Sequence, residues 1–265
     1  MIKSIKIIFA SICLSVSFIL TAYAGQSCEV GTQKTEVLNT AVSKAVKVNE
    51  YLNSIDAKIV LIARIGQDLS KYNLKYSHVA FAYKKLGDDT WQVYHELNGC
   101  GSDQSSLYVE GLANFLLDDM VSYENKIFVP SKELQDRLYD SIVTNPQESK
   151  SLHESNYNMV AMPFSTKYQN SNQWVLEIVA KSLSKDKTIT NRKEAQQWLS
   201  LMGYQPTTLQ VGTLTRLGGR MFKTNIAFDD HPFNRRMAGQ IDTVTVDSVY
   251  EFLKKADSKG NTIEL

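Results

Sequence analysis

The stretch QNSNQWVLE, residues 169–177, changes within three residues from polar side chains to an apolar run with helical spacing. It predicts a helix that begins near Ser171 and ends at about Leu183, with Trp174 and Ile178 on its inner face. Ser171 has two interpretations. Serine is a preferred N-cap residue, a role that Asn170 could equally fill. Alternatively, Ser171 is a nucleophile at the positive end of the helix dipole. Spacing alone favours the cap.

Two histidines are the candidate partners of Ser171, because a serine hydroxyl is inert unless a base takes its proton. His78 lies at the start of a predicted strand, residues 77–83, and His95 near the end of the next, residues 90–97. The glycine and aspartates of the intervening KKLGDD predict a hairpin turn. A two- or four-residue connection would place both rings on one face, directly opposite or one diagonal step apart. The alternative, which spacing alone favours, is a pair of hydrogen-bonded core histidines.

The rest of the chain mixes predicted helices and strands without an internal repeat or a linker. Helices are expected over residues 35–52, 108–120, 131–143, 191–202 and 245–256. Strands are expected over residues 58–65 and 157–162, the second ended by Pro163, and RLGGR (216–220) is expected to be a tight glycine turn. These elements predict an α+β fold with an antiparallel sheet packed against helices.

The first 24 residues have the layout of a secretory signal peptide. Two lysines in MIKSIK precede the apolar run IIFASICLSVSFIL and the small residues Ala22 and Ala24. We therefore expect cleavage after Ala24 and a single domain over residues 25–265. The apolar run is too short for a comfortable membrane span, and no later segment is apolar enough to cross a bilayer. We therefore predict that the protein is periplasmic or secreted and that it is not an integral membrane protein after signal cleavage.

Charge and cysteine content restrict the possible partners further. The signal removes two of the 29 basic residues and none of the 28 acidic ones, so the mature net charge is near −1. This balance argues against nucleic acid or an anionic membrane surface as a partner. The mature chain keeps Cys28 and Cys100, which in an oxidising compartment most simply form one disulfide. The alternative is that Cys100 is a catalytic thiol.

The order of SHVAFAY, a strand ending in YHEL, and a later strand leading into QNSNQWVLE resembles the circularly permuted papain-like hydrolases. These include the NlpC/P60 peptidases and the lecithin retinol acyltransferase group. The resemblance implies that His78 is the base, His95 the residue that orients it, and Ser171 the nucleophile. Serine stands where that superfamily has cysteine. A hydroxyl does not form the low-pKa thiolate of a cysteine protease, so Ser171 would need general-base catalysis.

Over nearly the whole mature chain, a second pattern is more specific. The stretches RIGQDLSKY, YSHVAFAY, EGLANFLLDD, PFSTKYQNSNQWVLE and AFDDHP are similar to an uncharacterised bacterial family, domain of unknown function family 2145. This resemblance implies no established activity.

One further polar cluster, Asp229, Asp230 and His231, precedes Pro232. Three consecutive residues rarely all reach one metal ion, so we interpret the cluster as a structural loop or as a rim of the active cleft. Neither a metal nor a cofactor is expected.

Together these features predict an exported acyl-transfer hydrolase, an amidase, peptidase or esterase, with Ser171, His78 and His95 in its site. Its substrate would be a peptide, cell-wall or lipid acyl compound. The alternative is a catalytically inactive envelope protein that binds a peptide or lipid in the same cleft.

Overall fold

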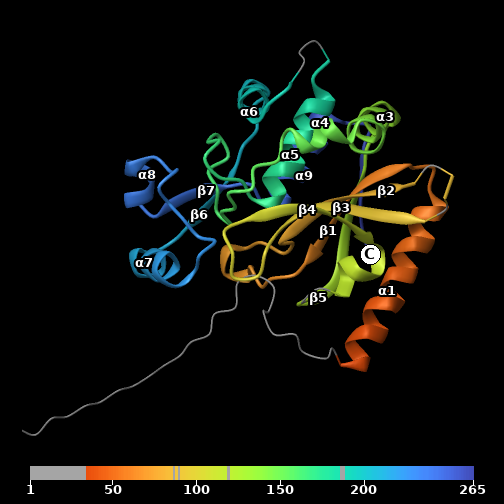
Figure 1. Ribbon diagram of the computed structural model, residues 1–265, viewed down its shortest axis with the longest axis horizontal. Helices are drawn as coiled ribbons and strands as arrows, with labels where there is room; N and C mark the ends of the chain where they lie inside the picture. The colour runs from red at the N-terminus through yellow and green to blue at the C-terminus, as the bar shows by residue number, and fades with distance from the viewer. Residues whose placement is uncertain (1–33, 86, 89, 118–119, 186–188) are drawn as a thin grey trace, which may run out of the picture.

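The protein is built around a six-stranded antiparallel sheet (Figure 1). The computed structural model describes residues 34–85, 87–88, 90–117, 120–185 and 189–265, so the predicted signal peptide lies outside the described residues. The strand order in the sheet is β4-β3-β2-β1-β5-β8, and a second sheet pairs β6 with β7. The strands are β1 (Ile59–Ile65), β2 (His78–Lys84), β3 (Trp91–Asn98), β4 (Ser105–Gly111), β5 (Ser122–Val129), β6 (Thr207–Gln210), β7 (Gln240–Thr243) and β8 (Asn261–Glu264).

Helices cover both faces of the large sheet. The helices of the described ranges are α1 (Thr35–Ser54), α2 (Leu112–Leu117), α3 (Lys132–Tyr139), α4 (Pro146–Lys150), α5 (Ser171–Leu183), α6 (Arg192–Leu201), α7 (Thr213–Phe222), α8 (Phe233–Met237) and α9 (Val246–Ala256), of which α7 and α8 lie beside the small sheet (Figure 1). A 3-10 turn, Ser70–Tyr72, and a π-helical turn, Asp140–Thr144, complete the regular structure. None of the helices in the described ranges is long and apolar enough to cross a membrane.

Strand alternation divides the core into two layers. Residues such as Leu61 and Phe81 face one side, where they share a core with residues of α3, α5 and α9 and of α6, which packs on α5. Residues such as Ile62 and Ala80 face the other side, where α1 and α2 cover them (Figure 1). Because β1 is central and covered on both faces, all seven of its residues are buried.

The predicted α+β class with an antiparallel sheet is therefore confirmed. Three local predictions were wrong. The helix expected over 108–120 begins only at Leu112, because the preceding residues form β4 and pair with β3. The strand expected over 157–162 is a series of turns with one bridge, Tyr157 to Gln169. RLGGR is not a turn but part of helix α7.

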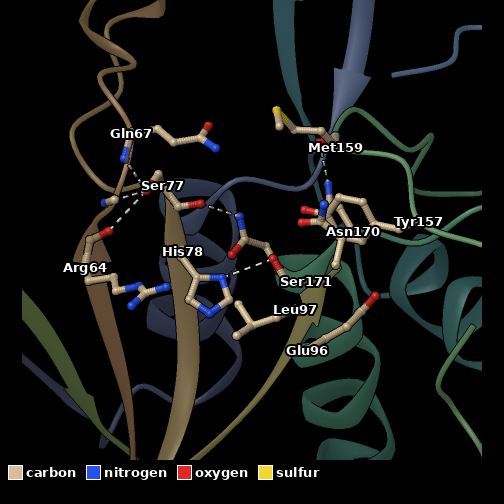
Figure 2. A pocket seen from close by; sticks show the side chains of 13 residues that line it. Arg64, Gln67, Ser77, His78, Glu96, Leu97, Tyr157, Met159, Asn170 and Ser171 are labelled. Atoms are coloured by element: carbon tan, nitrogen blue, oxygen red, sulfur yellow. Dashed lines mark hydrogen bonds between the residues drawn. The ribbon is translucent and has the colours of Figure 1, made fainter. Parts of the chain in front are cut away.

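The opening for a site lies between β2 and β3. Their paired residues run only from Phe81–Tyr94 to Lys84–Trp91, although β2 begins at His78 and β3 continues to Asn98. The two strands thus separate at the end where both histidines lie, and the N-terminus of α5 occupies this position (Figure 2).

Candidate active site

Ser171 is the first residue of α5 and not its cap. Asn170 caps the helix, because its side-chain oxygen accepts a hydrogen bond of 2.8 Å from the N–H of Gln173. The Asn170 amide group also donates to the Thr243 hydroxyl at 3.0 Å, which ties the helix start to β7. The Ser171 hydroxyl is therefore not used for capping. It lies 3.1 Å from Nδ1 of His78 (Figure 2).

Asn172 fixes this helix start against β2. Its side-chain oxygen accepts a hydrogen bond of 3.0 Å from the N–H of Val79, and its amide group donates to the carbonyl of Ser77 at 3.2 Å. The amide thus pairs with β2 as a peptide group of a neighbouring strand would, at the place where β3 has moved away. Ser171 directly precedes Asn172, and His78 directly precedes Val79. The hydrogen bond between Asn172 and Val79 therefore holds Ser171 and His78 next to each other.

A line of polar contacts continues from Ser171 through the sheet. Nε2 of His78 lies 3.0 Å from Nδ1 of His95, and Nε2 of His95 lies 3.1 Å from a carboxylate oxygen of Glu110 on β4. The β2–β3 register makes the two histidines diagonal neighbours, with ring centroids 5.2 Å apart. The structure therefore brings together all three residues named from the sequence, and it adds Glu110 to them.

Burial keeps the His78 ring neutral. Its pKa lies well below the usual 6.5, mainly because burial penalises the charged form, and also because the Arg64 guanidinium and His95 are close. Arg64 is held in place by a hydrogen bond to the carbonyl of Phe115 and by contact with the ring of that residue. A neutral imidazole has a free lone pair, which a general base requires.

A cavity of about 120 Å³ adjoins Ser171 and His78 (Figure 2). Glu96, Tyr157 and Asn98 are among its lining residues. Glu96 has no exposed surface, and neither of its carboxyl oxygens has a hydrogen-bond partner among the described residues. Burial raises the pKa of Glu96 to about 8, against a smaller lowering by the nearby Ser105 hydroxyl. Glu96 is thus a neutral carboxylic acid at pH 7.

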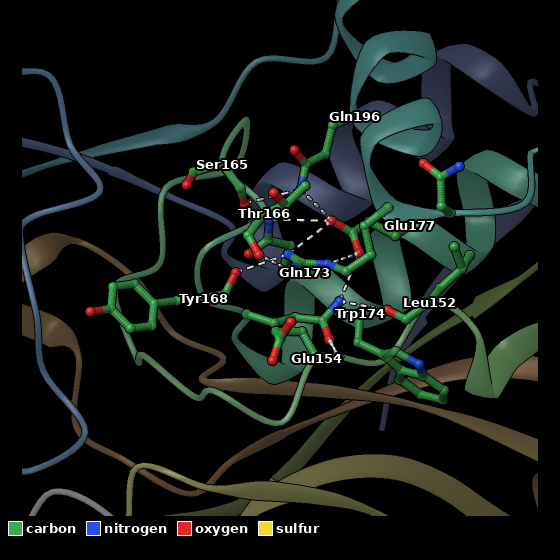
Figure 3. Close-up of polar contacts among 12 residues, drawn as sticks. Leu152, Glu154, Ser165, Thr166, Tyr168, Gln173, Trp174, Glu177 and Gln196 are labelled. Carbon is green, nitrogen blue, oxygen red and sulfur yellow. Dashed lines mark hydrogen bonds and ion pairs between the residues drawn. The ribbon is translucent and has the colours of Figure 1, made fainter.

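A buried network behind α5 holds the loop that leads to Ser171 (Figure 3). The Glu177 carboxylate accepts hydrogen bonds from Gln169 at 2.7 Å, Gln196 at 2.8 Å and the Nε of Arg192 at 2.8 Å. The guanidinium of Arg192 also donates to two loop carbonyls, those of Thr166 and Tyr168. The charges of Glu177 and Arg192 are therefore paired with each other. Together the two side chains hold the loop residues Thr166, Tyr168 and Gln169 in front of the helix.

The remaining candidates from the sequence lie outside this group. His231 lies 2.8 Å from the carbonyl of Val160 through its Nε2, and Asp230 accepts from the N–H of Met162, so the loop that contains them braces residues 160–162. In the described ranges, no group of three or more His, Cys, Asp or Glu side chains is arranged to hold a metal ion. Cys100 lies exposed in the turn after β3. Its predicted partner Cys28 lies outside the described residues, so their disulfide stays a prediction.

A family model matches most of the chain. The family described as "Uncharacterized protein conserved in bacteria (DUF2145)" matches residues 51–253, a region that contains every residue of the candidate site. No protein of curated function shows significant similarity to the chain, and no solved structure does.

Proposed function

The chain belongs to the uncharacterised bacterial family DUF2145, and we propose that it is an exported acyl-transfer hydrolase with Ser171 as its nucleophile. The observation that carries the proposal is the 3.1 Å contact between the Ser171 hydroxyl and Nδ1 of a buried, neutral His78. Hydroxyl, base and the second histidine, His95, follow one another at hydrogen-bond distance, as nucleophilic catalysis requires. A papain-like relationship of the fold is part of this proposal.

The first half of the reaction forms an acyl-enzyme. The Ser171 oxygen attacks the carbonyl carbon of an amide or ester while Nδ1 of His78 takes the hydroxyl proton. The negative charge that develops on the carbonyl oxygen faces the N-terminus of α5, where the first backbone N–H groups have no partner within the helix. When the carbon–nitrogen or carbon–oxygen bond breaks, His78 returns the proton to the departing amine or alcohol.

The second half regenerates the serine. A water molecule attacks the ester on Ser171 while His78 takes its proton, and the proton then passes to the serine oxygen as the carboxylic acid leaves. The mechanism requires that the Nε2–H of His78 donates to Nδ1 of His95, which lies 3.0 Å away, so that this contact holds the His78 ring throughout. A peptide, cell-wall or lipid acyl compound is the proposed substrate class, and neither a metal nor a cofactor takes part in these steps.

Reaction with a fluorophosphonate probe tests the proposal. We expect the wild-type protein to be labelled on Ser171, and we expect the Ser171→Ala and His78→Ala variants not to be labelled. The matched control is Ser131→Ala. Ser131 is a true helix cap, with its hydroxyl accepting from the N–H of Leu134, so its loss should reduce stability and leave labelling unchanged.

A second measurement separates the enzyme from the binding protein with an inactive site. In the Ser171→Cys variant, we expect the pKa of the thiol, read from the alkylation rate against pH, to lie below the ordinary value of about 8.5. The shift should disappear when His78 is also replaced. Absence of labelling together with a thiol of ordinary pKa would reject the hydrolase and favour a protein that binds a peptide or lipid in this cleft.

A further inference from the structure

The contacts from Ser171 to Glu110 form a series: the Ser171–His78 and His78–His95 contacts are hydrogen bonds, and the His95–Glu110 contact is a close approach of the carboxylate to the ring nitrogen without hydrogen-bond alignment. The distances are 3.1 Å from Ser171 Oγ to His78 Nδ1, 3.0 Å from His78 Nε2 to His95 Nδ1, and 3.1 Å from His95 Nε2 to Glu110 Oε1. A neutral imidazole has one N–H donor and one acceptor nitrogen. The two rings must therefore both carry their proton on Nε2 or both carry it on Nδ1 if their shared contact is to be a hydrogen bond.

Only one of these two states allows catalysis. With both protons on Nε2, Nδ1 of His78 has a free lone pair that can accept the Ser171 proton. With both protons on Nδ1, His78 presents an N–H to the serine oxygen and cannot act as its base. The site therefore needs something that selects between the two tautomeric states.

We propose that Glu110 is a positioning residue that makes this selection. The negative charge of an ionised carboxylate attracts a proton and repels a lone pair, so Glu110, with an oxygen 3.1 Å from Nε2 of His95, favours the proton on that nitrogen. His95 must then accept at Nδ1, which in turn fixes the proton of His78 on Nε2. That this tautomer serves catalysis rests on the proposed function. The effect of Glu110 on the tautomer does not depend on that function.

The position of Glu110 supports this role. In the β3–β4 register, Glu110 is opposite Val93 and one diagonal step from His95, so its side chain lies on the same face of the sheet as the ring. His95 has no exposed surface and is enclosed by His78, the Phe115 ring and Glu110. Glu110 keeps 23% of its side chain exposed, so water can solvate its charge.

The test is the position of the ring protons, measured by nitrogen NMR at pH 7.5 on protein labelled with ¹⁵N-histidine. The chain has only four histidines, so their signals can be assigned by substitution. In the wild-type protein we expect His78 and His95 to be protonated on Nε2. In the Glu110→Gln variant, whose amide can donate as well as accept, we expect His95 to shift partly or fully to protonation on Nδ1.

The controls are Glu124→Gln, which removes an acid on another strand, and the signals of His153 and His231, which should stay unchanged. Labelling of Ser171 by the fluorophosphonate probe should slow about 10- to 100-fold in Glu110→Gln, by analogy with the loss of partners that orient metal-bound histidines. An unchanged His95 tautomer in Glu110→Gln would overturn the inference. A changed tautomer in a protein whose wild-type form is never labelled, and whose Ser171→Cys thiol has an ordinary pKa, would uphold the inference and reject the proposed function instead.

Discussion

The buried carboxyl of Glu96 should make the stability of the protein fall with rising pH. Glu96 has no exposed surface and no hydrogen-bond partner among the described residues, and burial raises its pKa from 4.5 to about 8. Between these two values the unfolded chain has lost the proton and the folded chain still binds it. Since the folded state then binds more protons, the free energy of unfolding decreases as pH increases.

The size of the effect follows from the two pKa values. The penalty is small below pH 4.5, because Glu96 is neutral in both states there, and it stops growing above about pH 8, where both states are ionised. With 1.36 kcal/mol per pKa unit, the wild-type protein should lose roughly 3 to 4 kcal/mol from this one group between pH 5 and pH 8. That is a large part of the stability of an ordinary domain.

The Glu96→Gln variant keeps the shape of the side chain and removes the titration. In urea unfolding of both proteins at several pH values from 5 to 8, the free energy of unfolding of the variant should rise relative to that of the wild type as pH increases. Glu50→Gln, which changes an exposed acid on α1, is the matched control and should follow the wild type. Parallel stability curves for the wild type and Glu96→Gln would show that Glu96 ionises normally in the folded state and would refute this reasoning.

Three further outcomes are expected. Asn170→Ala should lower the free energy of unfolding by roughly 0.5 to 2 kcal/mol through loss of the cap, whereas Ser171→Ala leaves the cap intact and should be the less destabilising change in a urea titration. Glu177→Ala strands a buried guanidinium and should cost about 3 to 5 kcal/mol in the same assay, and a loss below about 1 kcal/mol would contradict a buried ion pair. Thiol titration of the unfolded, unreduced mature protein should find no free thiol, and two thiols would reject the Cys28–Cys100 bridge.

The proximity of the three site residues could be predicted because it depends on simple regularities. His78 and His95 lie on adjacent strands, and alternation along a strand allows only a few relative positions. The structure has the diagonal one, with residues 85–90 connecting the strands. The start of α5 within a residue of Ser171 followed from the change in polarity.

What the sequence could not show depends on tertiary contacts. Asn170 and Ser171 are both preferred caps, and only the position of His78 shows that the serine hydroxyl is used elsewhere. The sequence predicts a helix around Glu110, because the neighbouring apolar residues fit a helical period, whereas pairing with β3 makes this segment a strand. Its contact with His95 therefore could not be foreseen. Burial of Glu96 was equally hidden, since acids are almost always exposed.

The pairing of Asn172 with β2 also has a consequence for how the protein folds. This amide joins residues more than 90 positions apart, and Ser171, His78 and His95 meet only after the β2–β3 hairpin has formed and helix α5 has docked against it. Contacts of such sequence separation form only after a large loss of chain entropy, so they belong to the late, cooperative part of folding. In a partly folded chain these side chains would be present but would not lie within hydrogen-bond distance of one another. The amount of protein labelled at Ser171 would therefore report the fraction of molecules that are fully folded.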